Sequence, residues 1–333
     1  MACFARYLVP AVLALALWVD GALAEHIKIG SLKTVGTGPI YIADAKGYFA
    51  AENLEIEMVV FDSAQPVAVA AVAGDIDIGA TALTAGFYSL AGQGALRMLA
   101  AQSFERPGYQ DQAVVASNRA WDAGLKSIKD LAGHSVAISQ IGGAPHYSLG
   151  LLAEHFGIDL RNLRVLPLQS NANRISAIAG NTADSAIIPV TYVTASLRRG
   201  EAKLLGWVGD YAPWQLGAVF VSTRTANERR DMLERFLRAY RRGTHDYHAA
   251  FTGADGKLRF GATADEIAAI IAKGAGQKDE DIRLGITYLD AEGRIDVKDI
   301  LHQIAWYKAQ GMIKGEVDGA AIIDKRYAVP LPE

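Results

Sequence analysis

Cysteine is almost absent from this sequence of 333 residues: the only one is Cys3. Cys3 lies in an N-terminal segment that we expect to be removed on export, so the mature chain would have no thiol. A chain without thiols forms no disulfides, has no cysteine nucleophile and binds no metal through thiolates. Cys3 also precedes the apolar part of this segment, which is the wrong position for a lipoprotein anchor.

The sequence also lacks an excess of charge of either sign. Its formal net charge is −3 and its pI is near 6.2, so nucleic acid is not an expected partner. Hydrophobic residues make up 51% and charged residues 21%, which argues against disorder and against a polytopic membrane protein. The length exceeds what one hydrophobic core usually serves and predicts two domains or lobes.

No hydrophobic run is long enough to cross a bilayer. The run Tyr7 to Val19 follows Arg6, contains Pro10 and is shorter than the roughly 18 residues that a membrane span needs. Ala22-Leu23-Ala24 is an A-x-A cleavage site, so residues 1–24 are predicted to be a secretory signal peptide. We therefore expect a periplasmic protein that starts near Glu25, with an uncleaved anchor as the alternative.

The rest of the chain carries one pattern of strands and helices twice. Strands and helices alternate in the first copy at residues 27–29, 40–46, 54–61, 66–73 and 76–80. They alternate in the second copy at residues 135–138, 145–156, 163–168, 172–179 and 185–189. The repeat predicts an α/β chain with two βαβαβ lobes, each built on a parallel sheet.

The segments outside the two copies set the domain boundaries. Two apolar runs, residues 113–117 and 216–223, are expected to be crossovers between the lobes. A helix is predicted over 231–251, a capping box at Thr263–Glu266 predicts another, and this C-terminal part is expected to pack on the first lobe. Lobe 1 is therefore predicted to comprise residues 25–112 and 218–333, and lobe 2 residues 113–217.

Three segments in a fixed order carry a family resemblance: Gly38–Ala43 with Gly47-Tyr48-Phe49, then Ala73–Gly79, then Ser127–Ala137. In these segments the chain resembles the nitrate, sulfonate and taurine type of ABC solute-binding proteins, a superfamily that includes thiamine-pyrimidine binders. The resemblance covers residues 27 to 222. It implies a type II periplasmic-binding-protein fold with C-terminal helices, a hinged cleft, an ABC permease as partner, and no catalysis.

The loops that follow the predicted strands are the candidate binding site, because ligands of open parallel sheets bind beyond the carboxyl ends of the strands. The turns Gly36–Pro39 and Gly142–Pro145 each precede a helix, whose N-terminus favours an anion. The predicted ligand-binding residues are Thr37, Gly38, Tyr41, Thr81, Ala82, Ser103, Phe104, Ser139, Gly142, Gly143, His146, Asn171, Thr191, Tyr192 and Trp214. Their aromatic members favour an organic carboxylate or sulfonate over an inorganic oxyanion.

Three of these features have a second interpretation. The turn Gly36-x-Gly38 either approaches a ligand or is a tight turn without one. His146 either donates to a ligand or caps its own helix. Trp214 either covers a ligand or packs in the core.

No catalytic residue, metal site or cofactor is predicted. Asp77 is echoed by Asp184 in the second copy, which indicates a repeated turn or cap. His245 and His248 lack a third metal ligand nearby. The segment His146–Gly150 lacks the leading glycine of a nucleophile elbow.

The predicted mechanism is capture by hinge closure in a monomer, followed by docking on the permease. One alternative is an enzyme on the same fold, such as a pyrimidine-synthesis relative. The other is a binding module that reports to a sensor.

Overall fold

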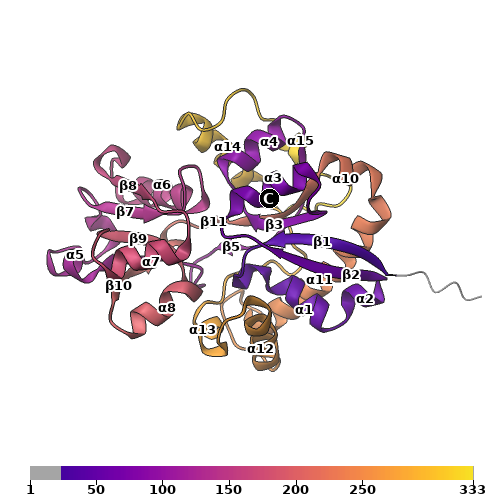
Figure 1. Cartoon of the computed structure of the whole chain (residues 1–333), viewed down its shortest axis with the longest axis horizontal. Helices are drawn as coiled ribbons and strands as arrows, with labels where there is room; N and C mark the ends of the chain where they lie inside the picture. The colour runs from indigo at the N-terminus through magenta and orange to yellow at the C-terminus, as the bar shows by residue number, and fades with distance from the viewer. Residues whose placement is uncertain (1–23, 333) are drawn as a thin grey trace, which may run out of the picture.

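The computed structural model describes residues 24–332, which form two α/β lobes side by side (Figure 1). The predicted signal peptide, its cleavage site and Cys3 fall outside the described residues, apart from Ala24. None of the helices in the described part of the chain is both long enough and apolar enough to span a membrane.

The first lobe is built on a five-stranded sheet of order β2-β1-β3-β12-β4. Its strands are β1 (Glu25–Ser31), β2 (Leu54–Val60), β3 (Ile78–Ala82), β4 (Leu96–Ala101) and β12 (Gly217–Ser222). Helices α1 (Gly38–Ala45), α2 (Tyr48–Ala51) and α11 (Arg230–Phe251) cover one face of this sheet. Helices α3 (Ala64–Ala73) and α4 (Ala85–Gly92) cover the other.

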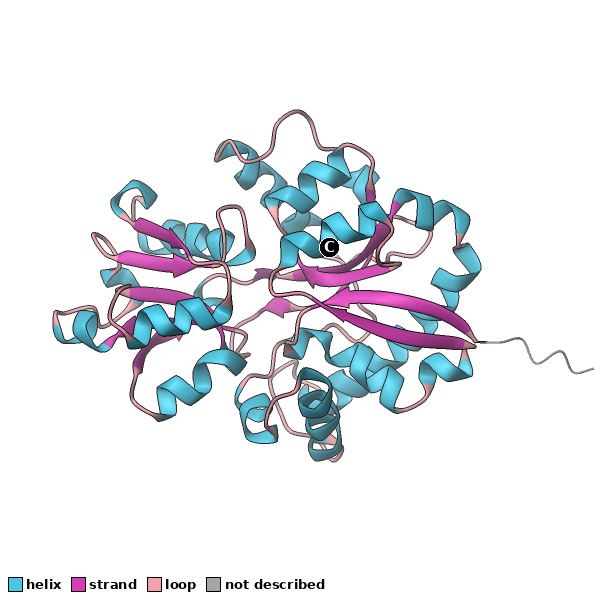
Figure 2. Ribbon diagram, in the orientation of Figure 1, coloured by secondary structure: helices cyan, strands magenta, loops and turns pink. Residues whose placement is uncertain are grey.

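The second lobe repeats this architecture with a sheet of order β10-β6-β9-β7-β8. Its strands are β6 (Gln112–Ser117), β7 (Ser135–Ile138), β8 (Arg164–Pro167), β9 (Ser185–Pro189) and β10 (Ala202–Trp207). Helix α6 (Ala144–Phe156) packs on one face. Helices α7 (Asn171–Ala179) and α8 (Val190–Arg198) pack on the other (Figure 2).

The repeat extends to single side chains. The Asp77 carboxylate accepts a hydrogen bond of 2.8 Å from the backbone N–H of Lys28 on β1. Asp184 accepts one of 2.9 Å from the N–H of Ser135 on β7, the equivalent strand of the second lobe. The interpretation of these two aspartates as repeated caps is confirmed.

Both sheets are mixed, whereas the sequence predicted parallel ones. The two apolar runs expected to be crossovers are the inner strands β6 and β12, which pair antiparallel with both of their neighbours. They start at the junction of the lobes and run away from it, opposite to the parallel strands. The crossover itself is the two-stranded ladder of β5 (Phe104–Glu105) and β11 (Trp214–Gln215) (Figure 1).

The C-terminal helices pack on the first lobe and also reach the second. Helix α12 (Ala264–Ala275) packs on α1, but its N-cap Thr263 makes no side-chain capping bond, so the predicted capping box does not form. Helix α13 (Asp279–Leu284) contacts α8, and α14 (Val297–Ala309) places His302 2.6 Å from the Tyr147 hydroxyl on α6. The remaining helices are α5 (Asn118–Asp122), α9 (Val208–Tyr211), α10 (Thr223–Glu228) and α15 (Gly319–Ile322), with short 3-10 turns at Val35–Thr37, Ile128–Asp130 and Leu160–Asn162.

Asp299 of α14 ties the C-terminal region to the crossover and makes folding depend on pH. Its carboxylate accepts hydrogen bonds from Gln215 N–H (2.8 Å) and Gln303 Nε2 (2.7 Å), while burial raises its pKa from 3.8 to about 7. The folded state therefore holds a proton that the unfolded state releases near pH 4. This group's contribution to stability falls as pH rises from 4 to 7, by at most about 4 kcal/mol.

We expect the Asp299→Asn protein to lack this fall in folding stability between pH 4 and pH 7. Melting temperatures of both proteins between pH 4 and 7.5 should show the wild type losing stability relative to the variant as pH rises. Parallel curves would contradict the assignment.

Candidate functional site

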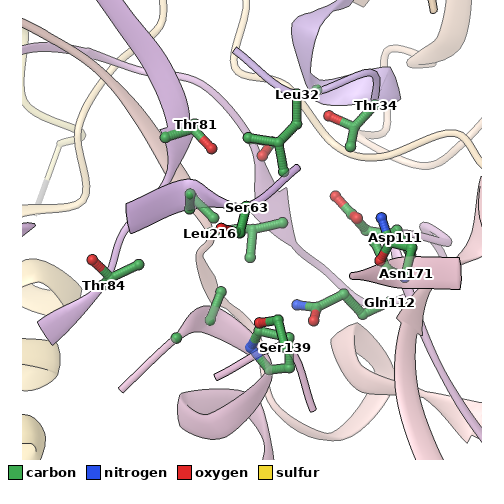
Figure 3. A pocket seen from close by; sticks show the side chains of 18 of the residues that line it. Leu32, Thr34, Ser63, Thr81, Thr84, Asp111, Gln112, Ser139, Asn171 and Leu216 are labelled. Carbon is green, nitrogen blue, oxygen red and sulfur yellow. The ribbon is translucent and has the colours of Figure 1, made fainter. Parts of the chain in front are cut away.

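A cavity lies between the two lobes, at the carboxyl ends of the parallel strands. It encloses about 750 Å³, including its open mouth. The first lobe contributes segments that follow β1, β2, β3 and β4, and the second contributes segments that follow β7, β8 and β9 (Figure 3). Asp111, Gln112 and Leu216, beside the crossover, complete the wall. The cavity thus occupies the place that the strand order predicts for a ligand.

Several predicted site residues border this cavity. They come from both lobes and are Thr81, Ala82, Ser103, Ser139, Gly143 and Asn171. Figure 3 shows Thr81 on one side of the cavity and Ser139 and Asn171 toward the other. Their contact with a ligand stays a prediction.

The two glycine-rich turns differ in what they present. In the second, Gly143, Ala144 and Pro145 border the cavity, and the N-cap Gly143 leaves the first turn of α6 without a side-chain cap. In the first, only Gly36 borders it. The Thr37 hydroxyl donates to Leu32 O at 2.7 Å, and a Cβ on Gly38 would lie 3.1 Å from Ile271. That glycine therefore permits close helix packing.

The predicted aromatic residues do not border the cavity. Tyr41 packs over Gly274 of α12, where any Cβ would lie 2.4 Å from the ring, and burial raises its pKa to about 12. Phe104 and Trp214 lie in a separate hollow at the crossover, and Trp214 packs edge-on against Tyr147. Tyr192 uses its hydroxyl to donate to Lys33 O across the two lobes, at 3.0 Å. The argument for an aromatic ligand therefore has no support at the cavity wall.

His146, Gly142 and Thr191 are also engaged elsewhere. The N–H of Gly142, in the turn before α6, donates to His146 Nδ1 at 3.1 Å, and burial lowers the pKa of His146. The Gly142 carbonyl accepts a 2.8 Å hydrogen bond from Ala85 of the first lobe. Thr191 packs beside Gly285. His146 thus holds the turn that leads into its helix, and its contact with a ligand stays a prediction.

The one basic side chain of the cavity wall among the described residues is Arg174 on α7, which was not among the predicted site residues. Only 4% of Arg174 is exposed. Its guanidinium donates to Ile187 O and to Asn171 Oδ1, its Nε has no protein partner, and it forms no ion pair with any described carboxylate. Burial lowers its pKa to about 10, so it stays charged at neutral pH. An uncompensated cation here favours an anionic ligand group.

Two carboxyl groups beside the crossover, Asp111 and Glu105, were also not among the predicted site residues. Asp111 borders the cavity and keeps part of its surface exposed, while Glu105 is buried behind it with Oε2 unpartnered. Burial raises the pKa of Asp111 to about 6. Burial and the neighbouring Asp111 raise the pKa of Glu105 strongly. Because the two carboxyl groups are buried neighbours, a negative charge on one opposes ionisation of the other.

A sequence signal existed for Arg174. Ala177 and Ile178 follow it by three and four residues and so share its face of the helix, which is the face that packs on the sheet. An arginine on an otherwise apolar face is a functional candidate. No comparable signal marks Asp111, because its burial arises from segments distant in sequence, including Thr287 beside it.

The two lobes touch on both sides of the cavity. On one side Arg198 of α8 forms a 2.8 Å ion pair with Asp281 of α13, next to the Tyr192–Lys33 hydrogen bond. On the other side the Ala85–Gly142 hydrogen bond joins the lobes. The structure therefore shows the lobes closed around the cavity.

Solved structures with this arrangement fall into one fold class. The aliphatic sulphonate binding protein SsuA from Escherichia coli is 18% identical, with a TM-score of 0.70, over 93% of this chain and 94% of its own. The nitrate-binding protein NrtA from Synechocystis is 15% identical, with a TM-score of 0.68, over 90% and 85%. The desulfurization enzyme DSZB is 12% identical, with a TM-score of 0.61, over 92% and 96%. A search of curated proteins finds no match.

The two mixed sheets, the paired crossover and the cavity between the lobes define a periplasmic-binding-protein fold, as predicted. The NMT1/THI5-like family model matches residues 35–250. The chain belongs to the NMT1/THI5-like family.

Proposed function

We propose that this protein is the periplasmic solute-binding component of an ABC importer and captures a small organic acid between its lobes. The observation that carries the proposal is Arg174, a buried arginine in the cavity wall without an acidic partner among the described residues. The N-terminus of α6 at Gly143 faces the same cavity and adds favourable potential for an anion.

The rest of the cavity supports binding of an organic group. Polar side chains such as Thr81, Ser103 and Ser139 can hydrogen-bond a ligand, while Leu32 and Leu216 present apolar surface. Sulfonate and nitrate binding by the proteins with similar structures fits an anion in this place. Residues 25–112 with 218–333 would move as one lobe and residues 113–217 as the other, about the β5–β11 ladder.

The test is a thermal-shift screen of the protein expressed from the full-length sequence. The panel contains aliphatic and aromatic carboxylates, sulfonates, pyrimidines, nitrate and sulfate. We expect one class of organic acid to raise the melting temperature by several degrees, because a ligand that binds only the folded state stabilises it. A response to inorganic oxyanions alone, or to none of the acids, would contradict the proposal.

The similarity to DSZB keeps an enzyme as the second candidate. Turnover of the bound acid, followed by mass spectrometry of the ligand after incubation, distinguishes the two functions. Recovery of unchanged ligand supports a binding protein.

A further inference from the structure

The hydroxyl of Tyr192, one of the predicted ligand-binding residues, lies at the contact between the two lobes. It donates a 3.0 Å hydrogen bond to the backbone oxygen of Lys33, in the loop that follows β1. The residues on either side of Lys33, Leu32 and Thr34, border the cavity. This hydrogen bond therefore joins α8 of the second lobe to the cavity wall of the first, and it must break when the lobes separate.

The side chain of Asn171 interacts with both Arg174 and Tyr192. Asn171 Oδ1 accepts a hydrogen bond from the Arg174 guanidinium, which leaves the amide nitrogen of Asn171 as the donor for a second partner. Burial raises the pKa of Tyr192, and a side-chain hydrogen bond with Asn171 opposes that rise, as a donor to the phenol oxygen does. Three hydrogen bonds thus run in one direction, from the guanidinium through Asn171 and Tyr192 to the first lobe.

The Lys33 oxygen has a second donor in its own lobe. This donor is Gln277 Nε2, 3.1 Å away, in the segment that follows α12. Because the Lys33 oxygen keeps that hydrogen bond when the lobes separate, opening breaks only the one from the Tyr192 hydroxyl. The net contribution of one hydrogen bond changes an equilibrium by roughly 3- to 10-fold. The contact can therefore favour closure without locking the lobes together.

We propose that Tyr192 is a positioning residue that links Arg174 to lobe closure through Asn171. This inference rests on the proposed function, in which an acid group binds Arg174. The guanidinium fixes which end of the Asn171 amide faces Tyr192, because the opposite end would accept the hydroxyl and draw it away from Lys33. An acid that holds the guanidinium in place therefore also holds Asn171 in the orientation that closure needs, and occupancy of the site favours the closed state.

The test is hydrogen exchange of the Ala85 backbone N–H, measured by NMR on the ligand-free protein. This N–H donates to Gly142 O across the lobes at 2.8 Å, on the other side of the cavity from Tyr192, so its exchange reports separation of the lobes and not a local change at Tyr192. We expect Tyr192→Phe to raise the exchange rate roughly 3- to 10-fold, because the closed state loses one hydrogen bond. Tyr211→Phe, at an exposed tyrosine of the same lobe, is the matched control and should leave the rate unchanged.

Asn171→Asp distinguishes a link to Arg174 from an isolated contact between the lobes. The carboxylate keeps the hydrogen bond from Arg174, but it has no N–H to donate and accepts the Tyr192 hydroxyl in place of Lys33 O. We expect Asn171→Asp to raise the exchange rate of Ala85 by a similar factor. Tyr192→Phe should then have no further effect in the Asn171→Asp background, because both substitutions remove the same hydrogen bond.

An unchanged exchange rate in Tyr192→Phe, an equal rise in Tyr211→Phe, or additive effects of Tyr192→Phe and Asn171→Asp would each overturn the inference. None of these results bears on the proposed function, because the experiment contains no ligand. The absence of a response to organic acids in the thermal-shift screen contradicts that function instead. The melting temperature of each variant verifies that it is folded.

Discussion

Replacing Arg174 with glutamine is expected to weaken binding of the acid ligand by about 100-fold or more. Truncating one partner of a buried charge pair costs roughly 2–5 kcal/mol, because the remaining charge is left without its partner. Arg174 is buried in the cavity wall and is the one basic group on that wall among the described residues. The measurement is calorimetric titration of the wild type and the variant with the acid found in the screen.

Arg161→Gln is the matched control for Arg174→Gln. Arg161 belongs to the same lobe, but its side chain is 90% exposed and pairs with Asp159 at the surface, so binding should be unchanged. Arg174→Lys keeps the charge but loses the planar fork, and we expect it to bind with intermediate affinity. Unchanged affinity in a folded Arg174→Gln protein would remove the basis of the proposed function.

Gly243→Ala is expected to cost about 3 kcal/mol of stability, although alanine is the better helix former. Gly243 lies in the middle of α11, where α1 crosses it. A Cβ at this position would lie 2.1 Å from the backbone oxygen of Pro39. The backbone of α1 cannot move aside without disturbing the turn at Gly36 that borders the cavity. Thermal unfolding should show a melting temperature at least 5 °C lower than that of the wild type.

Ala249→Val, on an exposed position of the same helix, provides the comparison for Gly243→Ala. It adds apolar volume where space is open, so only helix propensity changes, by less than about 1 kcal/mol. If Gly243→Ala had the same melting temperature as Ala249→Val, α1 and α11 would be able to accommodate the added methyl group without loss of stability.

The order of strands and helices could be predicted from the sequence because it depends on local patterns. The helix predicted over 231–251 is observed at Arg230–Phe251, and the strands predicted at 135–138 and 185–189 are observed there. The repeat of Asp77 at Asp184 also predicted correctly that both are caps, since each accepts a hydrogen bond from the backbone of a neighbouring strand. Periodicity and capping are properties of short segments.

The aromatic residues of the predicted site show what local sequence patterns cannot predict. Tyr41, Phe104, Tyr192 and Trp214 all follow strands or lie in the loops of the site, yet none borders the cavity. The C-terminal helices, whose position the local pattern does not specify, bury Tyr41, and the crossover takes Phe104 and Trp214. Tyr192 contacts Lys33 only because the lobes close.

The sequence by itself determined two α/β lobes, a cavity at the carboxyl ends of their parallel strands, and the polar loop residues Thr81, Ser139 and Asn171 on its wall. Only the tertiary structure decided that β6 and β12 enter the sheets antiparallel and that Arg174 and Asp111 lie on the cavity wall. The physical reason is that the role we propose for Arg174 depends on its burial without an acidic partner among the described residues. Burial depends on segments far apart in the chain, such as α7 against Ile187 and Asp111 beside Thr287.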